Sequence, residues 1–257
     1  MHVKRISGLL RSRAVVMALV GAALWLTGCG DAATRRAGEF IQPIEQAHGK
    51  SAWDAHRELQ ADFALSFGDR PPMRGRMWTT TGVGRVRMEI SGGPTLVFDG
   101  SRAWVSPADA EFPRARFHLL TWPYFLAAPF KLDDPGTRIE SLGELPLREG
   151  EAMPAAKLTF GEGVGDTPDD WYILYRDPRT HRLVAMAYIV TYGTPAEQAE
   201  GEPHAIVYDG FTTVDGAVVS TDWQFYHWSR ETGVHGEPMG RMKLRNLQFT
   251  QPTLLRY

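Results

Sequence analysis

The chain has 257 residues, with 28 lysines and arginines against 30 aspartates and glutamates, and a single cysteine. Hydrophobic residues make up 43% of the chain, and a chain of this length can bury a core within one domain. The excess of acidic over basic residues, which grows if the targeting segment is removed as described below, argues against nucleic acid as the main partner. One cysteine cannot form a disulfide within the chain, so stability must come from burial.

The first 28 residues have the pattern of a targeting segment. Four basic residues precede an apolar stretch at residues 14–26, and the tetrapeptide Leu26-Thr27-Gly28-Cys29 follows. This arrangement resembles a bacterial lipoprotein signal peptide, which implies cleavage before Cys29 and lipidation of that cysteine. The alternative is an ordinary signal peptide or an uncleaved anchor, in which Cys29 is incidental.

Cleavage at this point would leave residues 29–257 as the mature chain. The removed segment holds four basic residues and no acidic ones, so 24 basic residues remain against 30 acidic ones, a net charge of −6. That charge disfavours an anionic membrane face as a partner. The anchor would hold the protein in the cell envelope, facing the periplasm. In enterobacteria an aspartate directly after the lipidated cysteine favours the inner membrane, so Gly30 favours the outer membrane.

Residues 29–38 are small, polar and charged, and we expect them to form a tether to a single domain at residues 39–257. The domain starts with two predicted short helices, at residues 40–47 and from Ser51. Alternating apolar and polar residues then predict about eleven strands, beginning with Leu59 to Phe67. The dipeptide Asp99-Gly100 between two apolar runs predicts a tight antiparallel hairpin.

An uncharged, apolar segment at residues 117–130 interrupts the strands. It is too short to cross a bilayer. Thr121 is placed to cap a helix of roughly two turns with Pro123 in its first turn, and Pro129 ends it. We therefore predict an α+β protein in which a curved antiparallel sheet, an unclosed barrel, holds the N-terminal helices and this mid-chain helix on its concave face. A sandwich or a closed barrel is the alternative.

One local sequence carries a resemblance to a known fold. The hairpin Phe98-Asp99-Gly100-Ser101-Arg102-Ala103-Trp104, followed by the apolar segment, resembles the periplasmic lipoprotein-carrier superfold (LolA/LolB-like). That resemblance implies an eleven-stranded half-barrel whose helices cover a hydrophobic cavity. Residues 47–49, 129–136 and 165–172 also look like an uncharacterised family of secreted bacterial proteins without assigned activity.

The motifs of common enzymes are absent from the sequence. It has no Gly-x-Ser-x-Gly elbow, no phosphate loop and no Gly-x-Gly-x-x-Gly turn after a strand, so we expect no cofactor and no catalysis. The histidines lack the spacing of a zinc site, and we predict no metal. Acidic residues at 166, 169 and 170 leave two alternatives open, a calcium loop and a hydrolase, although carboxylates in turns are commonly solvated or cap the next element.

Aromatic residues provide the positive functional signal, because large rings line sites for apolar ligands as well as filling cores. We predict that the chain is a monomer that binds a lipid, an acyl chain or a lipoprotein in the half-barrel. The alternative is a structural or protein-interaction lipoprotein with a filled core. The predicted ligand-binding residues are Trp78, Trp104, Trp122, Tyr124, Phe125, Trp171, Trp223 and Phe225.

Overall fold

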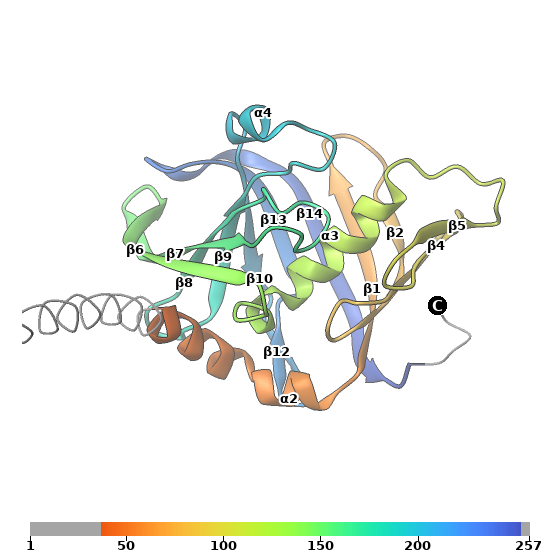
Figure 1. The fold of residues 1–257 in the computed structure, drawn as a ribbon, viewed down its shortest axis with the longest axis horizontal. Helices are drawn as coiled ribbons and strands as arrows, with labels where there is room; N and C mark the ends of the chain where they lie inside the picture. The colour runs from red at the N-terminus through yellow and green to blue at the C-terminus, as the bar shows by residue number, and fades with distance from the viewer. Residues whose placement is uncertain (1–36, 253–257) are drawn as a thin grey trace, which may run out of the picture.

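The computed structural model describes residues 37–252 (Figure 1). A helix over residues 37–48 is followed by α2 (Lys50–Ala55). The other helices are α3 (Ala115–Ala127), a 3-10 turn at Ala128–Phe130, and α4 (Ala196–Glu200). The strands are β1 (Glu58–Phe67), β2 (Met73–Thr80), β3 (Val86–Ile90), β4 (Thr95–Phe98), β5 (Ala103–Ser106), β6 (Thr137–Arg148), β7 (Glu151–Phe160), β8 (Tyr172–Arg176), β9 (Leu183–Tyr188), β10 (His204–Asp209), β11 (Thr212–Val214), β12 (Ala217–Val219), β13 (Asp222–Ser229) and β14 (Gly233–Thr250).

Twelve of the strands form one antiparallel sheet, in the order β5-β4-β3-β2-β1-β14-β13-β10-β9-β8-β7-β6. The long strand β14 lies between β1 and β13, so the last strand joins the two halves of the sheet. β5 and β6 are its edges and do not pair with each other, so the barrel stays open. The predicted fold class, an unclosed antiparallel barrel with helices, is confirmed.

The helix α3 crosses the concave face of the sheet, as Figure 1 shows. It begins at Ala115, so the predicted start with Thr121 as its cap is wrong, and Pro123 lies inside the helix. An internal proline costs about 3 kcal/mol because it removes a backbone hydrogen bond. Each fully buried large apolar side chain contributes about 1.5 to 3 kcal/mol. The core offsets the proline with four such side chains on α3: Leu119, Trp122, Phe125 and Leu126.

The space under α3 is closed by the N-terminal helices. Ile44 and Trp53 are buried in the same core as α3, and the Trp53 ring stacks on Phe130 with centroids 4.2 Å apart. A small cavity beside Phe125 and Trp223 measures about 10 Å³. A volume of that size holds about one water molecule. The concave face directly beneath α3 is therefore filled with side chains.

The convex face carries a second, smaller hydrophobic core that the sequence did not predict. Leu145 and Leu147 of β6 pack over small residues of the central strands, such as Ala185 and Ala205. The Tyr175 hydroxyl donates to the carbonyl oxygen of Pro146 at 3.1 Å. It also accepts from the indole N–H of Trp228 at 2.9 Å. This core fixes the end of β6 against the back of the sheet.

Candidate functional site

A pocket of about 510 Å³ opens along one flank of α3. It is lined by α3, by the loop between β7 and β8, by the start of β8 and the end of β9, and by residues near β3 and β4. Pockets that hold small molecules commonly have volumes of about 300 to 1,000 Å³. The aromatic and aliphatic side chains that line it include Phe98, Phe117, Leu120, Tyr124, Phe125, Phe160, Val164, Tyr172, Tyr188 and Tyr192.

The inner wall of this α3 pocket is an interlocked set of rings. Tyr124 lies 5.5 Å from Tyr172, and Phe125 lies 5.0 Å from Tyr188, between ring centroids. Phe160 packs edge-on against Tyr172 at 5.8 Å. Burial raises the pKa of all three tyrosines, so their hydroxyl groups stay protonated. Within residues 37–252 none of the three hydroxyls has a hydrogen-bond partner, which leaves three polar groups on an apolar wall.

Two ion pairs form the rim of the α3 pocket. The Arg116 guanidinium binds both carboxylate oxygens of Asp166, which holds the pKa of Asp166 below its usual value. Arg116 also donates to the carbonyl oxygen of Ser101 at 2.9 Å. Lys131 pairs with Asp134, and both of these residues also line the pocket. The pocket thus combines an apolar interior with two ion pairs at its mouth.

The acidic loop between β7 and β8 is used structurally. Asp170 accepts hydrogen bonds from the backbone N–H and the hydroxyl of Thr191, at 2.8 and 2.7 Å, and from the hydroxyl of Thr167 at 2.7 Å. Asp166 faces Arg116. These carboxylates therefore fasten the loop to the segment after β9 and to α3, as expected of acidic residues in a turn.

The structure places the eight aromatic residues predicted to bind ligand at different sites, and most of them lie outside the α3 pocket. Trp122, Tyr124, Phe125, Trp223 and Phe225 pack together in the concave core, and only Tyr124 and Phe125 line the α3 pocket. Trp171 packs against the convex core. Trp78 lies on the convex side, where its indole N–H bonds the Gln60 side chain. Trp104 is 40% exposed on the outer face of β5.

Several residues of the α3 pocket were not singled out from the sequence. Tyr188 and Phe160 lie on strands that the alternation predicted, and Tyr172 lies in a segment that was noted for its likeness to an uncharacterised family. Arg116 immediately precedes the uncharged segment and was left outside it. Its position at the boundary between charged and apolar residues is the one local signal for a pocket rim.

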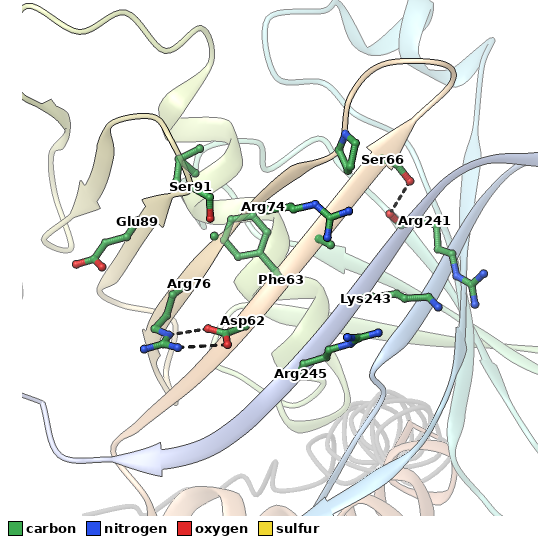
Figure 2. Close-up of a pocket in the computed structure, with 14 residues that line it drawn as sticks. Asp62, Phe63, Ser66, Arg74, Arg76, Glu89, Ser91, Arg241, Lys243 and Arg245 are labelled. Atoms are coloured by element: carbon green, nitrogen blue, oxygen red, sulfur yellow. Dashed lines mark hydrogen bonds and ion pairs between the residues drawn. The ribbon is translucent and has the colours of Figure 1, made fainter.

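A larger hollow of about 840 Å³ lies on the convex face, across β2, β1 and β14 (Figure 2). Ala64, one of its lining residues, pairs with Arg74 of β2 on one side and with Lys243 of β14 on the other. Five basic and two acidic side chains line it. This outer hollow is exposed and charged, so we regard the smaller α3 pocket as the better site for an apolar ligand.

Two of the five cations in the outer hollow are neutralised. Arg76 binds Asp62 through two hydrogen bonds, and Arg241 pairs with Asp222. Arg74, Lys243 and Arg245 form no ion pair with any residue that the structure describes, and Figure 2 shows them extending over the same part of the sheet. Three uncompensated cations attract an anionic group.

Comparison with known proteins supports the fold. No family model and no curated protein matches the chain. A LolA superfamily protein from Nitrosomonas europaea superposes with a TM-score of 0.55 at 9% identity, covering 84% of this chain and 94% of that protein. The fold is LolA-like. A DUF1329 family protein from Desulfovibrio piger gives a TM-score of 0.42 at 12% identity, covering 80% of this chain and 93% of that protein. A likeness at this level of identity concerns fold alone.

The membrane-related predictions concern a different part of the chain. Cys29, the targeting segment and most of the tether lie outside the described residues. Within residues 37–252, no helix combines the length and the hydrophobicity needed to cross a bilayer. Lipidation and the choice of membrane therefore remain predictions from the sequence.

Proposed function

We propose that this chain is a lipid-anchored protein of the cell envelope that binds an amphiphile with an acyl chain in the α3 pocket, without catalysing a reaction. The observation that carries the proposal is the pocket itself. Its wall of phenylalanine and tyrosine rings suits the burial of methylene groups, each worth about 0.8 kcal/mol. The ion-paired side chains at its mouth suit a polar head group.

The polar groups of the α3 pocket favour binding over hydrolysis. A carboxylate that acts as a general base or nucleophile has to reach the substrate. Here Asp166 is paired with Arg116, Asp134 is paired with Lys131, and Asp170 accepts three hydrogen bonds. The hydroxyls of Tyr124, Tyr172 and Tyr188 are instead available to bind a ligand's oxygen atoms.

Binding of a fluorescent long-chain fatty acid to the purified full chain tests the proposal. Leu120→Trp and Val164→Trp should fill the α3 pocket. A tryptophan that displaces two methylene groups costs about 1.6 kcal/mol, which raises the Kd about 15-fold. Trp104→Ala is the control, because it removes a large ring from the outer face and should leave the Kd unchanged. Absence of binding by the unmodified chain, or equal binding by both filled variants, would refute the proposal.

The anchor is tested separately from the pocket. Growth with labelled palmitate should label the chain in the membrane fraction, and Cys29→Ser should lose the label and release the protein from that fraction. A Cys29→Ser variant that remains in the membrane fraction would contradict the lipid anchor. Fatty-acid binding by the purified Cys29→Ser variant should be unaffected, because the α3 pocket is built from residues 82–192.

The outer hollow supports a second candidate function, the binding of an acidic segment of a partner protein. The carboxylates of Asp62 and Asp222 already pair with Arg76 and Arg241 on this surface. Arg74 and Arg245 offer the same guanidinium fork, which recognises carboxylates through two parallel hydrogen bonds. This site would serve the protein-interaction role that the sequence left open.

An acidic peptide of alternating Asp and Gly probes the outer hollow. Its affinity for the full chain should fall as salt is raised, and the triple change Arg74→Ser, Lys243→Ser, Arg245→Ser should abolish it. Lys157→Ser on β7, away from the hollow, is the control. Retained affinity in the triple variant would reject this function.

A further inference from the structure

A row of histidines crosses three neighbouring strands of the sheet. His204 at the start of β10 pairs directly with His227 of β13, and His227 pairs with His235 of β14. The ring centroids of His204 and His227 are 5.6 Å apart, and those of His227 and His235 are 6.2 Å apart. The side chain of Glu202 lies beside the first two rings.

The strand alternation fixes the side on which these imidazoles project. Ile206 lies two residues after His204 and Phe225 two residues before His227, and both are buried in the concave core. Residues two apart on a strand share a face, so His204 and His227 project on the concave side, at the end near α4. The Tyr188 ring borders His204 at 6.1 Å between centroids and also lines the α3 pocket.

The ligand atoms of three of these side chains converge. One carboxylate oxygen of Glu202 and one ring nitrogen each of His204 and His227 all lie within 4.8 Å of one another. Two ligand atoms of a tetrahedral Zn²⁺ ion are separated by about 3.4 Å, because each bond is about 2.0 to 2.2 Å long. Glu202 is exposed in the turn after α4, so its side chain has room to rotate towards the two imidazoles when an ion binds.

We propose that Glu202, His204 and His227 bind a divalent transition-metal ion of the Zn²⁺ class. Two imidazoles and one carboxylate are ligands that Zn²⁺ accepts, whereas Ca²⁺ and Mg²⁺ take oxygen ligands. Two of the three ligands are held by paired strands, which restricts their positions before the ion arrives. Three protein ligands leave at least one coordination position open to water or to another molecule.

His235 is the natural comparison within the same row. Its Nδ1 lies 3.2 Å from the carbonyl oxygen of Gly233, which orients the ring. It lies outside the group of three converging ligands. Replacing His235 therefore removes an imidazole from the same surface without removing a ligand of the proposed ion.

The test is a Zn²⁺ titration of the full chain after treatment with a chelator, with calorimetry and a chromophoric chelator as competitor. One ion per chain should bind. His204→Ala and His227→Ala should each weaken binding at least tenfold, since even the partners of metal ligands contribute about 10- to 100-fold. Glu202→Gln should weaken binding, and His235→Ala should leave it unchanged.

Two further measurements keep this result interpretable. Circular dichroism melts without metal should coincide for all variants, which excludes unfolding as the cause of lost binding. Co²⁺ in place of Zn²⁺ should give visible absorption bands that disappear in His204→Ala. Failure of the unmodified chain to bind Zn²⁺, or unaltered binding by both His204→Ala and His227→Ala, would overturn the proposal.

Discussion

His48 and Leu183 are joined by a hydrogen bond that is shielded from solvent: the backbone N–H of Leu183 donates to Nε2 of His48 at 3.0 Å. The other ring nitrogen, Nδ1, lies 2.7 Å from the carbonyl oxygen of Val218 and donates to it. A ring that accepts at one nitrogen and donates at the other is neutral. His48 thus connects the N-terminal helix to β9 and to β12, and only its uncharged form fits.

This arrangement predicts a loss of stability in mild acid. Burial lowers the pKa of His48 to about 4, from about 6.5 in the unfolded chain. The unfolded chain therefore binds the proton more readily, so the contribution of His48 is complete above pH 6.5 and is lost as the pH falls towards 4. The loss amounts to about 3 kcal/mol. Urea unfolding at pH 7.5, 5.5 and 4.5 measures it.

His48→Gln is the matched variant for this pH dependence. The variant should be less stable than the unmodified chain at pH 7.5, and its free energy of unfolding should change less between pH 6.5 and 4.5. Some variation will remain, because burial and then the charge of Arg114 lower the pKa of His118 to about 4 as well. An unchanged pH profile in His48→Gln would contradict this account.

Glu45 should give stability the opposite pH dependence, with a loss in mild base. Burial, and then the neighbouring Asp133 carboxyl group, raise the pKa of Glu45 to about 7. Because its pKa is raised in the folded chain, the contribution of Glu45 to stability is complete below pH 4.5 and is lost as the pH rises through 7. Glu45→Gln should raise the unfolding free energy at pH 8 by on the order of 1 kcal/mol and change little at pH 4.5. Thermal melts at both pH values compare the variants, and equal gains at both would argue against titration of Glu45.

Gly49 is predicted to tolerate no side chain. Its backbone is in the left-handed region, with φ of 71°, and a Cβ there would lie 2.2 Å from the carbonyl oxygen of Gly216. Gly49→Ala should cost more than the 1 to 2 kcal/mol that the left-handed conformation alone costs. Gly68→Ala is the control, because Gly68 also has a positive φ but no atom lies within 4 Å of its Cβ position. In urea unfolding, the free energy of unfolding of the Gly49→Ala variant should be well below that of Gly68→Ala.

The convex core gives a prediction about a single hydroxyl group. Tyr175→Phe removes the partner of both the Pro146 carbonyl and the Trp228 indole N–H. A buried polar group left without a partner costs about 1 to 3 kcal/mol. Because two such groups lose their partner, the free energy of unfolding should fall by at least that amount. Tyr226→Phe, in the same core, should cost less, since its partner Gln224 is half-buried and can turn to water. Equal losses in the two variants would count against the convex core as described.

Local periodicity was sufficient to predict the sheet. In β1, alternating apolar residues from Leu59 to Leu65 enter the concave core, because side chains of a strand alternate between its faces. The start of α3 could not be predicted in the same way. Its first turn, from Ala115, lacks a capping side chain and is held by contacts with distant strands.

By itself the sequence determined that the chain forms antiparallel strands interrupted by an apolar segment without charge, because alternation and charge are properties of neighbouring residues. The tertiary structure alone decided which rings face the α3 pocket. Trp104 has apolar neighbours on both sides, so alternation could not assign its face, and packing placed Ala103 and Val105 inward. The histidine row arises in the same way, since strand pairing brings together His204 and His227, which are far apart along the chain.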